Sequence, residues 1–371
     1  MANSTTNSTP STTSRRRQYT PGGSGPTGQI TVLTGRHGIA SAAIACHHQR
    51  VAVPPDLVDL SDLTGELLSW FRANYRDLPW RKSPVNSDSR TEHDRPGNPP
   101  PATAAWGVLV SEIMLQQTPV ARVEPVWRAW MQRWPTPAAL ASSSPADVIR
   151  AWGRLGYPRR ALRLHAAAAA IVERHGGVVP DDIESLRALP GIGEYTAGAV
   201  IAFAFGRPAL ALDTNVRRVL ARHDAGQARP PGSVTVGERE RALELLPTGV
   251  DGATWMAAIM ELGALVCTAR APRCEVCPIA AGCRWRAAGY PDAEKAARRQ
   301  PRYTGSDRQA RGAILAMLRD SAGPVTGRRI EMSWPDAVQR DRALDSLVAD
   351  GLVEPLPRGR FGLPASSSDH D

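Results

Sequence analysis

Leu189-Pro190-Gly191-Ile192-Gly193-Glu194-Tyr195-Thr196-Ala197-Gly198 is the stretch that decides the fold. It places Gly191 and Gly193 in a tight turn between two helical segments. Glycine lets the backbone approach a phosphate closely, and the following helix offers free N–H groups and the positive end of its dipole. Such a turn is typical of a helix–hairpin–helix that contacts the DNA backbone without reading bases. Ordinary helix–helix turns also use paired glycines, so the stretch alone leaves that alternative open.

The residues around this turn predict a helical body. Leu63, Leu67, Leu68 and Phe71 fall at helical spacing. Further helices are predicted over 106–115, 146–152, 161–175, 183–189, 195–205 and 214–222, separated by proline and glycine turn signals. Strand-like alternation is nearly absent, so the predicted fold class of this body is all-α.

Two carboxylates occupy positions that suit catalysis. Glu112 interrupts the apolar stretch 106–115, which makes it either a surface residue of a helix or a desolvated acid with a raised pKa. Asp213 precedes a helix and is either only its N-cap or a functional carboxylate. Cleavage of an N-glycosidic bond needs one acid that is protonated and one carboxylate that is ionised. Gln116 and Gln117 supply amides that can pair with base edges or fill a vacated stack.

Four of the five cysteines lie close together. Cys267, Cys274, Cys277 and Cys283 follow the spacing C-x6-C-x2-C-x5-C. Thiolates at such gaps converge on one centre, as zinc and iron–sulfur sites both require. Zinc sites more often pair two C-x2-C knuckles, and only one is present, so the spacing favours iron–sulfur. The remaining Cys46 is expected to be a free thiol.

The composition narrows the class of partner. The formal net charge of +9 and the isoelectric point near 9.9 favour a polyanion, either nucleic acid or an anionic membrane. The longest apolar runs are too short for a membrane span, and the N-terminal residues lack the apolar core of a secretory signal. We therefore expect a cytoplasmic, nucleoid-associated protein with no membrane partner.

The chain divides into three predicted parts. Residues 1–55 are rich in small polar residues and are predicted to be a disordered extension. Residues 56–295 form the catalytic region, interrupted by an exposed inserted loop at 82–103. Residues 296–371 predict two helices followed by a small hairpin, a winged-helix-like module that either binds DNA or only packs.

Together these motifs resemble the endonuclease III superfamily. The resemblance rests on Leu115-Gln116-Gln117-Thr118, on the glycine turn, on Asp213-Thr214-Asn215-Val216-Arg217-Arg218 and on the cysteine spacing. Leu78-Pro79-Trp80-Arg81 and Gly156-Tyr157 point within it to the MutY-type adenine DNA glycosylases. The resemblance implies a six-helix barrel, a helical domain that holds a [4Fe–4S] cluster, and an active site between them.

The same resemblance implies roles for particular residues. Glu112 looks like the acid that protonates adenine, and Asp213 like the carboxylate that stabilises the sugar cation, with Tyr195 and Asn215 as supporting groups. Gln117 and Tyr157 resemble residues that wedge into the DNA stack when adenine is flipped out. Arg76, Leu78, Trp80 and Arg81 look like the wall of the adenine pocket, although each alone could belong to the core or the surface.

Position 195 separates the relatives by chemistry. Bifunctional members carry a lysine there, which forms a Schiff base with the sugar and then cleaves the strand. Tyr195 predicts base removal without efficient strand scission. The expected partner is double-stranded DNA with A·8-oxoguanine or A·G mispairs, bound by a monomer.

The sequence also departs from the family pattern. Tyr157 is followed by Pro158, the insertion at 82–103 is long, and the residues after Ala296 are too few and too helical for the usual 8-oxoguanine-reading domain. Two other hypotheses remain at this point. One is a thymine or uracil mismatch glycosylase of the same superfamily. The other is a non-catalytic iron–sulfur DNA-binding regulator, which would make Glu112 and Asp213 incidental.

Overall fold

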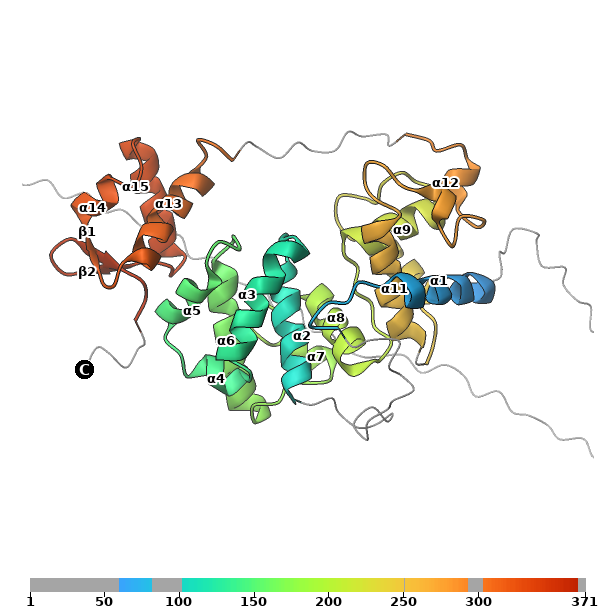
Figure 1. The fold of residues 1–371 in the computed structure, drawn as a ribbon, viewed down its shortest axis with the longest axis horizontal. Helices are drawn as coiled ribbons and strands as arrows, with labels where there is room; N and C mark the ends of the chain where they lie inside the picture. The colour runs from blue at the N-terminus through green and yellow to red at the C-terminus, as the bar shows by residue number, and fades with distance from the viewer. Residues whose placement is uncertain (1–59, 82–101, 250, 293–302, 366–371) are drawn as a thin grey trace, which may run out of the picture. The chain divides into compact units, whose positions relative to one another are not determined.

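The computed structural model describes residues 60–81, 102–249, 251–292 and 303–365 (Figure 1). The predicted N-terminal extension, with Cys46, and nearly all of the inserted loop therefore lie outside the described residues. The helices of the main body are α1 (Leu60–Asn74), α2 (Ala102–Leu115), α3 (Val120–Arg133), α4 (Pro137–Ala141), α5 (Pro145–Trp152), α6 (Arg159–His175), α7 (Ile183–Arg187), α8 (Glu194–Phe205), α9 (Thr214–His223), α10 (Val236–Leu245), α11 (Asp251–Leu265) and α12 (Arg284–Ala287). Its predicted all-α class is confirmed.

The first hydrophobic core lies among α2 to α8. Helix α2 is apolar on all sides, and Trp106, Leu109 and Met114 have no exposed surface. Helices α3, α6 and α8 pack around it. Such full burial explains why this helix carries so few polar residues and why a carboxylate within it is unusual.

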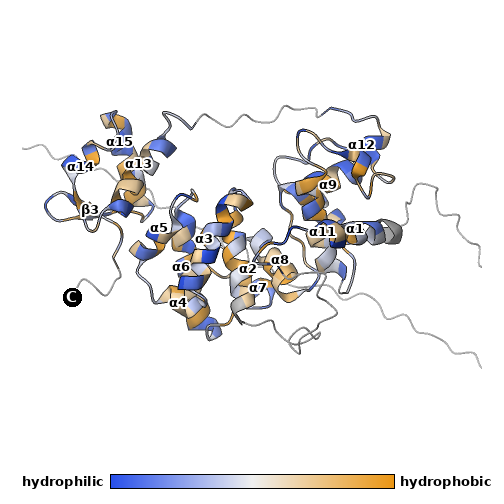
Figure 2. Ribbon diagram, viewed as in Figure 1, coloured by the Kyte–Doolittle hydropathy of each residue, from blue (hydrophilic) through white to orange (hydrophobic). Residues whose placement is uncertain are grey.

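The helices around α2 are amphipathic and begin at clear capping signals. Ser144 caps α5 by accepting a hydrogen bond from the N–H of Asp147, and Pro145 occupies the first helical position. Figure 2 shows hydrophilic and hydrophobic residues side by side along α5 and α6. Their apolar faces, with Val148, Trp152 and Leu164, complete the first core.

A second core joins α1 to α9 and α11. Leu67, Leu68 and Phe71 of α1 pack with Met256 and Leu262 of α11. Helix α8 contributes to both cores, because one of its faces lies in the first core and the other in the second. The end of α8 leads into the segment 206–213, so α8 links the two cores and positions the residues that follow.

The C-terminal residues form a small module. It contains α13 (Asp307–Asp320), β1 (Val325–Thr326), α14 (Gly327–Glu331), α15 (Ala337–Ala349), β2 (Glu354–Leu356) and β3 (Arg360–Gly362). The antiparallel sheet has the order β1-β3-β2, and its core also includes Ile149 of α5. This is the element order of a winged helix.

Two expectations about elements need correction. The module has three helices and a third strand rather than two helices and a hairpin, because α14 and β1 are too short to leave a periodic pattern. Helices α3, α4, α10, α11 and α12 were not predicted. Helix α3 is amphipathic but contains Pro125, which argues against a helix, whereas α11 is apolar all round and so lacks an amphipathic period. Helices α4 and α12 are too short to show one. The closed six-helix barrel stays a prediction. Among the described residues, no helix is long and apolar enough to cross a membrane.

Candidate active site and cysteine centre

Glu112 is a buried acid in the middle of α2. Only 5% of its surface is exposed, which decides between the two alternatives in favour of a desolvated carboxyl group. Burial disfavours the charged form and raises its pKa to about 7, although a hydrogen bond from Tyr195 and the charge of Arg81 oppose that rise. A carboxyl group with this pKa is a competent proton donor near neutral pH.

Tyr195 lies beside Glu112 because α8 packs against α2. Its hydroxyl donates a hydrogen bond to Oε2 of Glu112 at 2.8 Å. Burial, followed by the nearby charges of Glu112 and Asp213, raises the pKa of Tyr195 well above its usual value. The phenol therefore stays protonated and acts as a hydrogen-bond donor in this site.

Asp213 is both an N-cap and a half-buried functional candidate. Its Oδ1 accepts hydrogen bonds from the backbone N–H groups of Asn215 and Val216 at 2.9 and 2.7 Å, and its Oδ2 accepts one from Nδ2 of Asn215 at 2.8 Å. Burial raises the pKa of Asp213, and these hydrogen bonds oppose the rise. The cap thus fixes the carboxylate in one orientation at the start of α9.

A glycine sets how close Asp213 comes to α8. A Cβ built on Gly198 would lie 1.8 Å from the carbonyl oxygen of Leu210, closer than any real contact. The segment that ends at Asp213 can therefore rest directly on α8, three residues after Tyr195. The backbone contact explains why Tyr195 and Asp213 share one site.

Hydrogen bonds connect Asp213 to the cysteine loop. Asn215, which holds Oδ2 of Asp213, accepts a hydrogen bond at its Oδ1 from Nη2 of Arg218 at 2.8 Å. Nε of Arg218 donates to the carbonyl oxygen of Cys267 at 2.7 Å. Gly263 allows α11 to lie close to Asn215, because a Cβ built on Gly263 would be only 2.7 Å from Cβ of Asn215.

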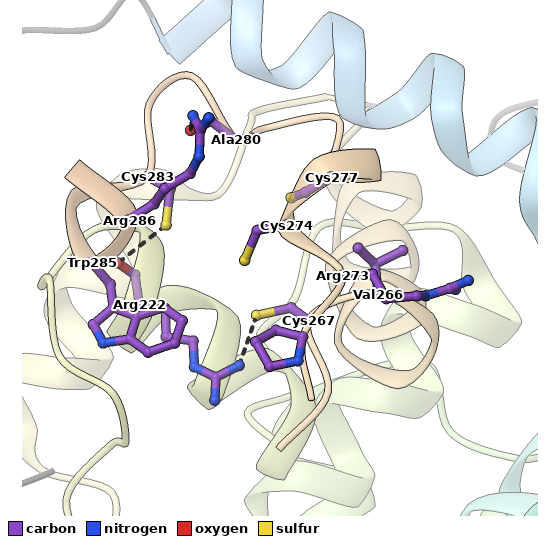
Figure 3. Close-up of a pocket in the computed structure, with 11 residues that line it drawn as sticks. Arg222, Val266, Cys267, Arg273, Cys274, Cys277, Ala280, Cys283, Trp285 and Arg286 are labelled. Atoms are coloured by element: carbon purple, nitrogen blue, oxygen red, sulfur yellow. Dashed lines mark hydrogen bonds between the residues drawn. The ribbon is translucent and has the colours of Figure 1, made fainter. Parts of the chain in front are cut away.

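The four predicted cysteines line one cavity (Figure 3). All are free thiols, and Figure 3 shows their sulfur atoms turned toward a common space. Within the described ranges, no three His, Cys, Asp or Glu side chains converge tightly enough for a single metal ion, whereas these four thiols surround a cavity. Four thiolates arranged in this way are the donor set of an iron–sulfur cluster.

Arg222 of α9 closes one side of the cavity. This side chain is 4% exposed, and its Nη1 donates to Sγ of Cys267 at 3.4 Å and to the carbonyl oxygen of Thr268 at 2.7 Å. Its guanidinium also stacks over Trp285, 4.6 Å from the ring. A buried cation suits a centre of thiolates, whose net charge is negative.

The predicted pocket wall contains an ion-pair cluster that sequence reasoning missed. Glu261 of α11 has no exposed surface and accepts hydrogen bonds from both Arg76 and Arg81, at 2.7 to 2.9 Å. Burial alone would raise the pKa of Glu261, but the two guanidinium groups outweigh it and lower the pKa to about 2. Leu78 and Trp80 are buried in the first core. Their role as an adenine-pocket wall stays a prediction.

The two predicted wedge residues are exposed and have left-handed backbones. Gln117 has φ of 57° and Tyr157 has φ of 45°, both uncommon for residues with side chains. Gln116, by contrast, points inward, and its Nε2 donates to Oγ1 of Thr196 at 3.4 Å. The backbone at positions 117 and 157 therefore presents both wedge side chains to solvent.

Arg160, which sequence reasoning did not identify, connects the loop that carries Gln117 to the loop that carries Tyr157; we call these the two wedge loops. It is 6% exposed; Nη1 donates to the carbonyl oxygen of Gln116 at 2.6 Å, and Nη2 to that of Gly156 at 3.0 Å. Further bonds reach the carbonyl oxygens of Ile113 and Met114 and the hydroxyl of Thr118. Burial lowers its pKa to about 10. No sequence spacing indicates a guanidinium whose partners are backbone carbonyls.

The glycine turn is built between α7 and α8 as predicted. Gly191 has φ of 79°, and a Cβ there would lie 2.8 Å from Cβ of Arg163, so the chain itself requires glycine. Gly193 has an ordinary φ of −95°, is exposed and faces open space. The fold does not require glycine at 193, which fits a position kept clear for a ligand at the start of α8.

Comparison with known proteins agrees with these features. Residues 110–246 match the family described as HhH-GPD superfamily base excision DNA repair protein. Residues 267–283 match the iron–sulfur binding domain of endonuclease III, which carries the family's [4Fe–4S] cluster, and all four predicted cysteines lie within this segment. Cys267, Cys274, Cys277 and Cys283 would hold the cluster, which would cross-link the loop that α9 and α11 support.

Comparison over longer stretches of the chain also finds DNA glycosylases. The adenine DNA glycosylase of Mycolicibacterium smegmatis is 52% identical over 299 residues, which cover 80% of this chain and 94% of that protein. The human adenine DNA glycosylase is 40% identical over 62% of this chain and 40% of its own length. A solved thermostable thymine-DNA glycosylase shares the fold, with a TM-score of 0.50, 23% identity, and coverage of 62% of this chain and 97% of that one. The buried acid, the capped aspartate, the glycine turn and the four-thiol cavity agree with these matches, and the chain belongs to the adenine DNA glycosylase family of the HhH-GPD superfamily.

Proposed function

We propose that this protein removes adenine opposite 8-oxoguanine or guanine in double-stranded DNA and does so without efficient strand cleavage. The observation that carries the proposal is the placement of Glu112, a buried acid with a pKa of about 7, beside Tyr195 and within the electrostatic field of Asp213. One carboxyl group is thereby tuned to give a proton while the other is held by three hydrogen bonds.

The proposed reaction uses the two carboxyl groups in turn. Protonated Glu112 donates its proton to N7 of adenine, and the C1′–N9 bond breaks with its electron pair moving onto the base. The ionised carboxylate of Asp213 stabilises the positive charge on the sugar. Water then bonds to C1′, and its proton returns to Glu112, which restores the starting state.

The residue at position 195 supports monofunctional chemistry. Tyr195 donates a hydrogen bond and has no amine that could form a Schiff base with the sugar. The product is then an intact strand with a missing base. Gln117 and Tyr157 are proposed to fill the space that the flipped adenine leaves, since both are exposed on loops held together by Arg160. We propose that the enzyme acts as a monomer on nucleoid DNA.

Single-turnover base release tests this function. Matched duplexes carry A·8-oxoguanine, A·G, A·C or T·G, and each reaction is divided between neutral and alkaline workup. We expect rapid adenine release opposite 8-oxoguanine, with strand breaks only after alkali. Release of thymine from T·G without adenine release would overturn the adenine assignment. A protein–DNA adduct trapped in high yield by borohydride would overturn the monofunctional assignment.

The regulator hypothesis is tested by Asp213→Asn. This substitution keeps the shape of the cap but removes the negative charge that faces the sugar. A glycosylase with the proposed mechanism loses turnover while its affinity for duplex DNA is retained. A regulator would show no measurable base release in either form.

A further inference from the structure

One edge of the C-terminal module brings together two segments that are about 30 residues apart in sequence. Thr326 of β1 pairs with Arg360 of β3, and Val325 pairs with Phe361. The N–H of Gly327, the first residue of α14, donates a hydrogen bond to the carbonyl oxygen of Gly359 at 2.9 Å. The start of α14 therefore lies against the turn between β2 and β3.

Four arginines occupy this edge. Arg328 and Arg329 belong to α14, Arg358 lies in the turn, and Arg360 begins β3. All four are exposed. The turn itself is fixed by two successive left-handed residues, Arg358 with φ of 64° and Gly359 with φ of 63°. We call these four arginines the arginine edge.

The arginine edge differs from the rest of the module in its charge partners. Arg311, Arg340 and Arg342 form ion pairs with Asp350, Asp341 and Asp307. Arg319 donates to the carbonyl oxygen of Gly153. Within the part of the chain that the structure describes, the four arginines of the edge form no ion pair with a carboxylate. Their positive charge is therefore not neutralised locally.

The helix that a winged helix usually places in a DNA groove is of mixed charge here. Helix α15 and its cap carry three exposed acidic residues, Asp336, Asp341 and Asp345, and two arginines, Arg340 and Arg342. Both arginines pair with aspartates of the module. The exposed carboxylates of α15 would be repelled by a phosphate backbone, which makes this helix a poorer phosphate contact than the arginine edge.

We propose that the arginine edge binds backbone phosphates of duplex DNA, as a second and sequence-independent contact beside the glycosylase site. Guanidinium groups match phosphate geometry and carry no base information when they stop at the backbone. The proposal rests on the proposed function in one respect, namely that duplex DNA is the polyanion the protein meets. The module then adds affinity and holds the enzyme on DNA between lesions.

Two double variants of the full-length protein test the edge by halves. R328Q/R329Q removes two charges from α14, and R358Q/R360Q removes two from the turn and β3. The matched control R308Q/R342Q removes two exposed charges from α13 and α15 of the same module. Binding to an undamaged duplex is measured over a series of KCl concentrations, and adenine release is measured in single turnover at saturating enzyme.

Each edge variant is expected to lower the slope of log affinity against log salt by about 0.9 for every phosphate that the protein no longer neutralises, and to weaken binding several-fold at low salt. The control is expected to keep the wild-type slope, and all three variants are expected to release adenine at the wild-type rate once bound. Wild-type slopes in both edge variants, or an equal effect in the control, would overturn the proposal.

Two further comparisons distinguish a DNA partner from a membrane partner, and the arginine edge from the proposed glycosylase function. If the edge variants lose binding to vesicles of anionic phospholipid but not to duplex DNA, the partner is a membrane surface and the proposal is wrong. If adenine release fails in every protein while the slopes differ as expected, the arginine edge stands and the proposed glycosylase function falls. Circular dichroism melting of each variant checks that the protein is folded under the binding conditions. Because the substituted arginines are exposed, the melting temperature is expected to stay at the wild-type value.

Discussion

The hydroxyl of Tyr195 and Oε2 of Glu112 are joined by a hydrogen bond of 2.8 Å, in which the phenol donates. This bond favours the ionised carboxylate, whereas burial favours the neutral acid and has the larger effect. The pKa of the proposed proton donor is therefore set by a competition between a neighbour and the surrounding apolar helix. Changing the neighbour should move the pH range in which the enzyme works.

Tyr195→Phe removes the donor and keeps the ring. The pKa of Glu112 is expected to rise further, by about one unit, because one net hydrogen bond to a charged group is worth about 1.5 kcal/mol or more. The single-turnover rate of adenine release is expected to decline near pH 7 in the wild type, where Glu112 loses its proton, and at a higher pH in the variant. A pH–rate profile of both proteins checks this. An unchanged midpoint would show that Tyr195 does not influence the acid.

Glu112→Gln is expected to abolish adenine release and to stabilise the protein in alkaline solution. The folded pKa of about 7 lies above the ordinary value, so the stability that Glu112 contributes is present at low pH and lost as pH rises through 7. At about pH 8.5 the variant should exceed the wild type by up to about 3 kcal/mol. Urea unfolding at that pH and at about pH 5 measures the difference in unfolding free energy between the variant and the wild type. This difference should be smaller at about pH 5. A difference independent of pH would contradict the assigned burial effect.

Arg160→Met tests the link between the wedge loops. The change leaves the carbonyl oxygens of Gln116 and Gly156 without their donor, and we expect a loss of about 2–4 kcal/mol in unfolding free energy. Base flipping should slow, which 2-aminopurine fluorescence beside the adenine reports. Arg159→Met is the control, since Arg159 is half exposed and pairs with Asp350. Equal effects of the two changes would argue against a specific role for Arg160.

Two glycines of the turn should respond differently to alanine. Gly193→Ala meets open space and an ordinary φ, so stability should fall by no more than about 1 kcal/mol, the cost of a poorer N-cap, while DNA affinity falls. Gly191→Ala meets Arg163 at a positive φ and should cost about 1–2 kcal/mol of stability. Thermal melting and duplex binding, measured together, separate the two effects. If Gly193→Ala bound DNA as the wild type does, the phosphate contact would lie elsewhere.

Sequence reasoning was strongest where local patterns carry the information. The glycine turn, the helices α2 and α8 and the clustered cysteines follow from spacing that any chain segment must show to form them. Glu112 could be singled out because a carboxylate within an apolar helix is conspicuous, but its burial and its partner could not. Those depend on α8 packing against α2, a contact between residues 83 positions apart.

Two functional candidates were not visible in the sequence for the same reason. Arg160 binds backbone carbonyl oxygens. Because every residue type has a backbone carbonyl, the sequence does not indicate which residues are its partners. Glu261 is acidic within an apolar helix, as Glu112 is, yet its pKa falls to about 2 rather than rising to about 7. The difference lies in Arg76 and Arg81, which come from a distant part of the chain. The charges around a carboxyl group depend on the tertiary structure. They determine that Glu112 can act as an acid, whereas Glu261 forms ion pairs.

The pairing of Arg76 with Glu261 spans 185 positions, and α1 packs on α11 in the same region. During synthesis at about 5–20 residues per second, α1 would leave the ribosome roughly 10–40 seconds before its partner exists. Its apolar residues Leu67, Leu68 and Phe71 lack their partners on α11 throughout that interval. The first helix of the domain to be made is thus among the last to be buried. The growing chain would be open to chaperone capture or aggregation until α11 emerges.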